Sequence, residues 1–387
     1  MFLNKLNNYK TEILIIGGGI AGCIAAISLA DSFKVTVVDK LALPADKVGE
    51  SLAPAAQRIL NKLQLLPDEE TQKSLFINNL GMQSYWGNDS VQIVDHLRNP
   101  DGFSKSLDRK KFEVYLRDKA IEKGVTCCWG LRFFNSIFED NLWKVTCKSD
   151  DLKNRTTTIF NADFVIDATG RSAHFAKSLQ IKRTSLDALI SCWITLPNKE
   201  ENAMSTIVSD ENGWWYTAVL PNNQRVLSYQ TDADLFEKSI FKNIDSFLEL
   251  IKKNKRIYSY VEKAIDQLQF HGTVSANSTK LDKVAGKQWL VLGDAAISFD
   301  PLSSQGMFNA MACAMQVTEL LKHFNFIKEY DIAKVYRFSE VYTSQINSIW
   351  KHYVKHKDLF YGAESRWKDA IFWKRRQVGV LKNEFAL

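Results

Sequence analysis

The chain has 387 residues, of which 45% are hydrophobic and 24% charged, and its formal net charge is +6. This length suits two domains with an appendage, and the modest charge without a basic run argues against a nucleic-acid partner. The six cysteines show no CxxC pair or zinc spacing, which favours a reduced, cytoplasmic protein without a metal site. No apolar signal segment opens the chain and no run is long enough to cross a bilayer, so we expect no membrane association.

The first motif reads as strand, glycine-rich turn, helix and strand. The apolar run at 12–16 leads into the glycine-rich stretch 17–22, and a helical pattern rich in alanine follows. A second apolar run covers 34–38 and is closed by Asp39. This order is the fingerprint of a dinucleotide-binding fold, in which an acidic residue about 20 positions downstream binds the ribose.

The three spaced glycines of this motif have separate tasks. We expect Gly17 to make the tight turn, Gly19 to let the backbone approach a pyrophosphate, and Gly22 to allow close packing of helix and strand. The following helix would direct its free N–H groups at the phosphates. The motif predicts a site for FAD or NAD(P).

The next segments alternate helical and strand-like patterns. A helix is predicted from residue 54 to about 65, strands at 82–86 and 91–94, and a helix after Asp108, which would cap it. Three strands then follow near 125–129, 134–139 and 142–147, and we expect them to form a meander that ends at 164–171. Further strands (212–221 and 224–231), a helical stretch (240–265) and a helix (306–324) are predicted beyond residue 185.

A second motif distinguishes FAD from NAD. The buried strand at 288–292 runs into Gly293-Asp294, and a helix starts at Gly306 after Pro301. An acid at a strand end can bind the ribityl hydroxyls of a flavin, and the helix N-terminus can stabilise negative charge on the reduced ring. An NAD-binding fold needs no such late element, so we predict FAD.

The order of these segments predicts an α/β fold with a strand-rich insert. A Rossmann-type FAD-binding domain would contain the nucleotide-type segments, an inserted α+β domain would bind substrate, and a helical C-terminal segment would follow. The expected ranges are 1–78, 101–178 and 275–330 for the FAD-binding domain, 79–100 and 179–274 for the substrate domain, and 331–387 for the helical segment.

The whole set of motifs resembles the FAD monooxygenase superfamily, in the branch that contains flavin-dependent tryptophan halogenases and geranylgeranyl-reductase-like flavoproteins. The resemblance rests on the motifs Gly17-x-Gly19-x-x-Gly22, Gly49-Glu50-Ser51, Asp108-Arg109, Asp167-Ala168-Thr169-Gly170-Arg171, Gly293-Asp294-Ala295 and Pro301-x-x-x-Gln305-Gly306. Aromatic hydroxylases of the superfamily carry an Asp-Gly motif for NAD(P)H where this chain has Ala168-Thr169-Gly170. A separate flavin reductase or donor is therefore a possible partner.

Three halogenase features are missing from the sequence. Residues 79–86 contain no lysine to capture hypohalous acid, Ser303 replaces a glutamate in the turn after Pro301, and a Trp-x-Trp-x-Ile-Pro strand becomes residues 216–221. Without the lysine amine, a halogenating relay lacks its carrier.

Two other stretches are similar to flavoproteins that mature quinone-cofactor amine dehydrogenases and amino-acid oxidases. They are Gly213 to Asp234 and the C-terminal 364–376. This resemblance implies oxygenation of a tryptophan in a precursor protein on the way to a tryptophylquinone, by way of a flavin C4a-hydroperoxide. Monooxygenation of a free indole-type aromatic and a non-catalytic FAD-binding assembly factor remain the alternatives.

Site residues follow from the motifs and the resemblance. Glu50 would orient the peroxide or the indole N–H, and Asp300 is the second candidate for proton transfer. The residues expected to bind FAD are Gly17, Gly19, Gly22, Asp39, Lys40, Ser51, Arg109, Gly170, Gly293, Asp294, Pro301, Gln305, Gly306 and Met307. Those expected to bind substrate are Trp86, Trp214 and Tyr216.

Overall fold

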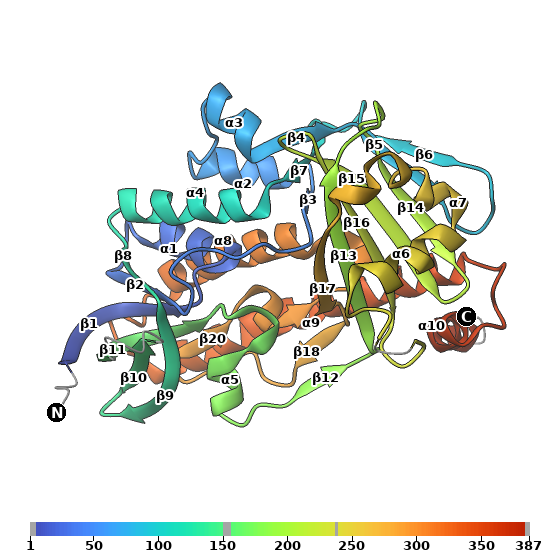
Figure 1. Ribbon diagram of the computed structural model, residues 1–387. Helices are drawn as coiled ribbons and strands as arrows, with labels where there is room; N and C mark the ends of the chain where they lie inside the picture. Colours follow the sequence, from blue (N-terminus) through green and yellow to red (C-terminus); the bar gives the residue numbers. More distant parts are fainter. Residues whose placement is uncertain (1–4, 150–155, 237–238, 384–387) are drawn as a thin grey trace.

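The structure, a computed structural model, describes residues 5–149, 156–236 and 239–383. Two large sheets lie side by side, the first on the left of Figure 1 and the second on the right. The long helix α9 (Ile332–Gly362) extends from the first sheet toward the second. The fold is therefore mixed α/β, as predicted.

The first sheet is built on five parallel strands in the order β20-β11-β1-β2-β8. Ile16 of β1 lies opposite both Val38 and Asp167, and Asp167 lies opposite Val291. The carboxyl ends of four strands therefore meet at one edge, where open α/β sheets bind their ligands. The strands of this sheet are β1 (Lys5–Ile16), β2 (Val35–Asp39), β8 (Thr126–Trp129), β9 (Leu131–Glu139), β10 (Leu142–Ser149), β11 (Thr156–Asp167), β19 (Ala285–Gly286) and β20 (Trp289–Val291).

The predicted meander is only partly right. Strands β9, β10 and β11 form antiparallel pairs, each with the next strand in the sequence, but β8 pairs in parallel with β2. The reason is the helix α4 (Arg109–Glu122), which carries the chain back along the sheet before β8 begins. Asp108 caps α4 as predicted, since its carboxylate accepts a hydrogen bond from the N–H of Lys111 at 3.0 Å.

Helices on the first sheet bury the glycine turn. Helix α1 lies between the sheet and α8, and the hydroxyls of Ser28 and Thr318 join them at 2.6 Å. Nearly every residue of α1 is buried, which explains why its sequence is apolar all round. The helices of this part are α1 (Ile20–Leu29), α2 (Ala56–Lys62), α3 (Glu69–Leu75), α5 (His174–Ser178) and α8 (Gly306–Phe324).

The second sheet has seven strands in the order β17-β13-β16-β15-β14-β5-β6. One face packs Trp215, Tyr229 and Phe247 into a core beneath α6 (Ile244–Lys253) and α7 (Lys255–Tyr258). The other face carries Trp193 and Tyr216, and Val48 packs against them. The strands are β5 (Gly81–Tyr85), β6 (Gln92–Asp95), β13 (Leu189–Pro197), β14 (Ser205–Asp210), β15 (Gly213–Leu220), β16 (Gln224–Asp232) and β17 (Gln269–Ser275).

Short sheets and the C-terminal helices link the two halves. Tyr342 of α9 donates to the carbonyl of Val291, and Arg376 of α10 (Ile371–Asn383) pairs with Asp232 of β16 at 2.6 Å. The short strands are β3 (Ser51–Leu52), β4 (Phe76–Asn79) and β7 (Ser104–Leu107) in one sheet, and β12 (Arg183–Ser185), β18 (Thr279–Leu281) and β21 (Ile297–Ser298) in the other.

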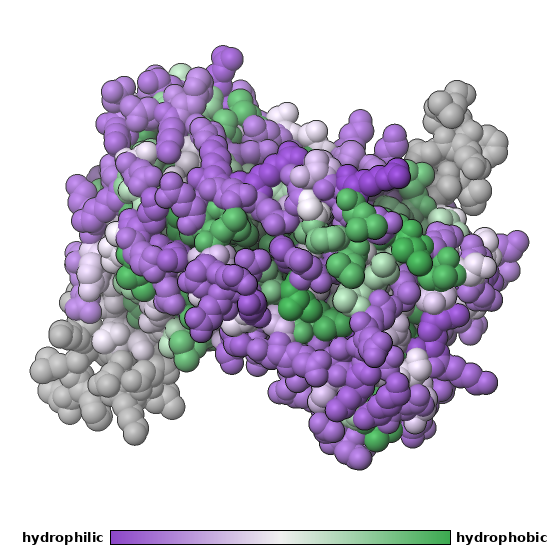
Figure 2. Space-filling view, turned by 90° about the horizontal axis from the view of Figure 1, so that it is seen from above, coloured by the Kyte–Doolittle hydropathy of each residue, from purple (hydrophilic) through white to green (hydrophobic). Residues whose placement is uncertain are grey.

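The surface seen from above is largely hydrophilic, with apolar side chains in an interrupted band across the middle of that face (Figure 2). Within the described ranges, none of the helices combines the length and apolar character needed to cross a membrane. The predicted domain boundaries remain a prediction, although the second sheet takes its strands from the two segments expected to form the substrate domain.

Candidate functional site

The glycine turn after β1 has the geometry that a pyrophosphate requires. Gly17 has φ +112°, and a Cβ atom there would lie 2.3 Å from the carbonyl oxygen of Ala168. A Cβ atom on Gly22 would lie 1.9 Å from the carbonyl oxygen of Gly17. A Cβ atom on Gly19 would meet nothing within 4 Å, so the space in front of the N-terminus of α1 is open. The three glycines thus have the separate tasks that the spacing predicts.

Asp39 is fixed beside this turn at the end of β2. Its carboxylate accepts hydrogen bonds from the N–H groups of Gly18 and Leu41, both at 2.7 Å, and lies 3.3 Å from Arg117. A carboxylate has about four acceptor positions, so these contacts leave capacity for a ribose hydroxyl. Lys40, the next predicted residue, is exposed beside it.

Arg117 was not predicted from the sequence. Its guanidinium is buried, donates to the carbonyl of Gly18 at 3.0 Å and lies over the indole of Trp129. It therefore holds the turn and Asp39 together from α4. The one signal for Arg117 in the sequence was its position on the buried face of a predicted helix.

The second FAD motif meets the first at the edge of the sheet. Gly293 has φ +62°, and a Cβ atom there would lie 3.0 Å from Cβ of Ala21 and 3.3 Å from Cβ of Ala310. The side chain of Asp294 is 42% exposed, and its nearest cation is Nε of Arg171 at 3.9 Å. Its oxygens are thus open to hydroxyl donors. Two segments about 270 residues apart in the sequence form one site.

The N-terminus of α8 faces the same region. Gln305 precedes the helix without a side-chain cap, and a Cβ atom on Gly306 would meet nothing within 4 Å. Gly170, with φ +64°, is equally open. An uncapped N-terminus of a 19-residue helix is a favourable position for a negative charge. The last two residues predicted here differ in burial: Met307 is buried, and Pro301 is exposed at the preceding turn.

Arg109 and the loop before β3 border the site. The Arg109 guanidinium donates to the carbonyl of Gly49 at 2.6 Å and to Glu113 at 2.8 Å, while its Nε is buried without a partner. Ser51 begins β3 and is half-buried. The residues present fit FAD: Gly19 leaves the N-terminus of α1 open, acids stand at both strand ends, and the uncapped N-terminus of α8 faces the same region.

Glu50, a predicted catalytic residue, is buried and held by the second sheet. The phenol of Tyr216 lies beside its carboxylate, and the N–H of Gly49 lies 3.2 Å from it. Burial raises the pKa of Glu50, because the charged form loses its solvation, and the hydrogen bonds oppose that shift. The pair brings a predicted catalytic and a predicted substrate residue together.

Asp300, the other predicted catalytic residue, is connected to Trp214 of β15 by two hydrogen bonds in series. Nε1 of Trp214 donates to the hydroxyl of Tyr361 at 3.0 Å, and that hydroxyl donates to the Asp300 carboxylate at 2.7 Å. Burial raises the pKa of Asp300. Its carboxylate also accepts from the N–H of Leu302 at 2.9 Å.

Two predicted substrate residues lie inside an aromatic cluster. Trp86 and Trp214 are 8% and 1% exposed and pack on Tyr361 and Trp373. The indole N–H of Trp86 donates to the carbonyl of Phe360 at 2.8 Å. Their contacts in the structure are with the C-terminal helices, and a substrate-binding function for them remains a prediction.

Sequence reasoning missed Trp193, which shares a face with Tyr216. Both lie opposite Ser228 of the strand between them, so the three form one row across the sheet. Trp193 stacks on His271 with ring centroids 3.8 Å apart, and burial lowers the pKa of His271. Nε1 of Trp193 is buried, and no described residue accepts a hydrogen bond from it.

Gln230 lies in the adjacent row of the same face. It lies opposite Trp214, and its amide nitrogen is 2.8 Å from the hydroxyl of Ser228. Its Oε1 is buried and accepts no hydrogen bond from the described part of the chain. A donor on Trp193 and an acceptor on Gln230 thus lack protein partners near Tyr216. The only signal in the sequence was a set of polar residues at alternate positions of one strand. Figure 1 places that strand, β16, in the middle of the second sheet.

Comparison with known proteins gives the class. Residues 10–325 match the family described as FAD binding domain, so the chain belongs to that family, binds FAD and is an FAD-dependent oxidoreductase. The predicted superfamily is confirmed.

Particular relatives narrow this class. The chain is 25% identical over 371 residues to the FAD-dependent oxidoreductase LodB of Marinomonas mediterranea, covering 95% of this chain and 97% of the relative. It is 25% identical over 379 residues to a tryptophan 2-halogenase of Chondromyces crocatus, covering 95% and 71%.

Solved structures show the same fold. The flavin-dependent halogenase CmlS superimposes with a TM-score of 0.82 at 20% identity, covering 97% of this chain and 70% of the halogenase. The peptidyl tryptophan dihydroxylase QhpG, described as essential for tryptophylquinone cofactor biogenesis, has a TM-score of 0.74 at 20% identity, covering 95% and 79%.

Proposed function

We propose that the chain is an FAD-dependent monooxygenase that hydroxylates a tryptophan side chain of a precursor protein during maturation of a tryptophylquinone cofactor. The precursor would belong to a quinone-cofactor oxidase or dehydrogenase, and a separate reductase would supply the electrons. LodB and QhpG among the similar proteins support a maturation flavoprotein, and QhpG by its title acts on a peptidyl tryptophan.

The observation that carries the proposal is the Glu50–Tyr216 pair. It places a buried carboxylate of raised pKa on the sheet face that also presents the unpaired N–H of Trp193 and the unpaired oxygen of Gln230. A buried polar group without a partner costs about 1–3 kcal/mol, and a bound polar ligand would remove that cost. An indole offers both an N–H donor and an aromatic face.

The missing lysine favours oxygen transfer over halogenation. Residues 79–86 form the end of β4 and the strand β5, and they contain no lysine. Ser303 lies in the turn after Pro301, where the halogenase resemblance would place a glutamate. A tryptophan could therefore receive the oxygen itself.

The chain's own residues would position the reaction. Bound FAD, once reduced, supplies two electrons and activates O₂; one oxygen atom enters the indole ring and the other leaves as water. The helix α8 would stabilise negative charge at the ring, and Glu50 would accept the indole N–H or hold a proton beside it. Asp300, kept in place by Tyr361, is the second group able to hold a proton.

Intact mass of a co-expressed candidate precursor tests the proposal. We expect a gain of one or more oxygen atoms on a tryptophan with this chain, and no gain with Gly19→Ala, which should lack FAD. Oxygenation of free indole but not of the precursor would support the small-aromatic alternative. A precursor that binds the FAD-loaded chain but gains no oxygen with reductant and air would instead indicate an assembly factor.

A further inference from the structure

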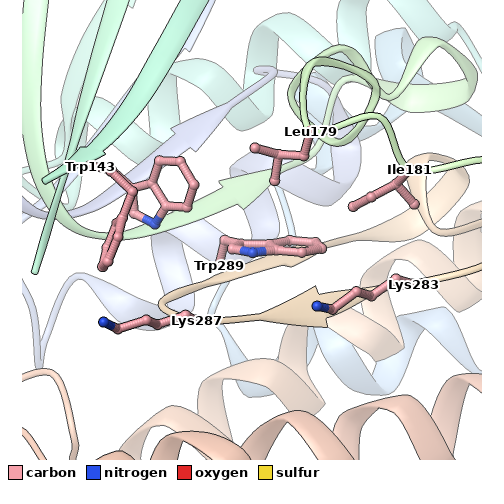
Figure 3. A pocket seen from close by; sticks show the side chains of 7 residues that line it. Trp143, Leu179, Ile181, Lys283, Lys287 and Trp289 are labelled. Carbon is pink, nitrogen blue, oxygen red and sulfur yellow. The ribbon is translucent and has the colours of Figure 1, made fainter.

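The pocket that suggests a further site lies at the start of β20, away from the carboxyl edge that holds FAD. It has a volume of about 340 Å³, and Trp143 and Trp289 form its walls (Figure 3). Its remaining lining residues are Phe138, Leu179, Ile181, Lys283 and Lys287. This volume is at the small end of the range for ligand pockets, and the lining is mainly apolar, as in most of them.

Charge in this pocket has one sign. Both charged lining residues are lysines, and no described carboxylate forms an ion pair with either of them. The ammonium group of Lys283 lies 5.8 Å from the ring centre of Trp289, and that of Lys287 lies 4.8 Å from the ring centre of Phe138. Each ammonium group thus lies over the face of an aromatic ring, without a carboxylate partner among the described residues, and is available to an anion.

An unpaired donor lies between the two tryptophans. Trp143 is 5% exposed, and its indole nitrogen has no hydrogen-bond partner among the residues that the structure describes. In Figure 3 this nitrogen points toward Trp289, while Leu179 and Ile181 lie on the side of the Trp289 ring opposite the lysines. A buried N–H without an acceptor is destabilising unless a ligand supplies one.

We infer that this pocket binds a planar aromatic carboxylate. The ring would pack against the two tryptophans, and the carboxylate would accept from the lysines and from the Trp143 N–H. The site is separate from the oxygenation reaction and does not depend on the proposed substrate. Lys283 and Lys287 also border a neighbouring hollow of about 630 Å³, but that hollow contains Glu340, which repels an anion.

Calorimetric titration of the FAD-loaded chain with 2-naphthoate tests this inference, with 2-naphthamide as a neutral probe and 2-naphthylmethylamine as a cationic one. We expect the carboxylate to bind about tenfold or more tightly than the amide, and the amine not to bind. The double variant Lys283→Gln/Lys287→Gln should weaken naphthoate binding about tenfold or more, and Trp143→Phe should weaken it by a smaller factor.

Ser339→Ala provides the matched control, because Ser339 lines only the neighbouring hollow. We expect it to leave naphthoate binding unchanged. The FAD content of each variant shows that it is folded, and the surface lysines can be replaced without disturbing the core even if Trp143 cannot. Equal binding of acid and amide, unchanged binding by the double lysine variant, or no binding of naphthoate would each overturn the inference.

Discussion

The phenol of Tyr216 lies beside the carboxylate of Glu50, which places a strand of the second sheet next to the loop that borders the FAD site. Two residues earlier on the same strand, Trp214 reaches Asp300 through Tyr361. One strand therefore lies beside one predicted catalytic carboxylate and is connected to the other through Tyr361.

Gly19→Ala should abolish FAD binding without unfolding the chain. Its new methyl group would meet no protein atom within 4 Å, so the apoprotein should keep its melting temperature. The methyl group would occupy the approach of the pyrophosphate, and we expect no measurable FAD binding. Flavin titration and thermal unfolding of the apoprotein measure the two effects.

Gly22→Ala gives the contrast for that prediction. Its Cβ atom would lie 1.9 Å from a backbone oxygen, so the chain itself should be destabilised. Equal melting temperatures for the two variants would contradict this account of the turn.

Glu50→Gln should stabilise the protein at neutral pH while reducing activity. Burial raises the pKa of Glu50 above its ordinary value of 4.5. The folded state therefore binds the proton more tightly than the unfolded state does. The stability that this gives is complete below about pH 4.5 and is lost as the pH rises through the folded-state pKa.

The gain from Glu50→Gln should therefore be small near pH 4 and larger at about pH 8, by about 1.4 kcal/mol for each unit of the pKa shift. Urea unfolding of the apoprotein at both pH values measures it. Oxygen transfer to the precursor should fall about 100-fold or more, with FAD content unchanged. A variant that is fully active would remove Glu50 from the proposed chemistry.

Tyr361→Phe should destabilise the protein strongly. Its hydroxyl accepts from Trp214 and donates to Asp300, and all three side chains are buried. Removing it leaves a buried donor and a buried acceptor unpaired, at about 1–3 kcal/mol each. Chemical denaturation measures the loss, and Tyr330→Phe, at an exposed position, should change stability by less than about 0.5 kcal/mol.

Asp232→Asn should separate the C-terminal helix from the second sheet. Asp232 and Arg376 form an ion pair at 2.6 Å with both side chains 2% exposed, so removing one charge leaves the other buried. The expected loss is about 3–5 kcal/mol. Asp234→Asn is the matched control: its side chain is 59% exposed and pairs with Arg375, so it should cost less than about 1 kcal/mol. Similar losses for the two variants would contradict this explanation.

The cysteines should be slow to react in the native protein. Burial raises the pKa of Cys147, Cys192 and Cys313 to about 12 and that of Cys127 to about 11, so few thiolates exist at neutral pH. Labelling with a thiol reagent should be slow for the native chain and complete for six thiols after denaturation. Rapid native labelling of Cys313 would show that α8 opens readily.

The FAD motif and most of the first sheet could be predicted from the amino-acid sequence. Glycine is required at positions 17 and 22 because a Cβ atom there would meet a backbone oxygen. For Gly22 this is the oxygen of Gly17, and for Gly17 it is that of Ala168, at the end of the neighbouring strand. The apolar runs at 12–16 and 34–38 likewise identify buried parallel strands, which carry no alternation. These features depend on short stretches of chain, so their pattern is visible in one sequence.

The side chains around Glu50 could not be predicted in the same way, because they come from strands far apart in the sequence. Trp193 and Gln230 look like ordinary strand residues, and their unpaired polar atoms appear only when three strands align in register. In the structure the indole N–H of Trp214 also donates a hydrogen bond to Tyr361, which lies 147 positions away in the sequence. Such a contact depends on how a C-terminal helix packs on the second sheet, and no local spacing in the sequence encodes that packing.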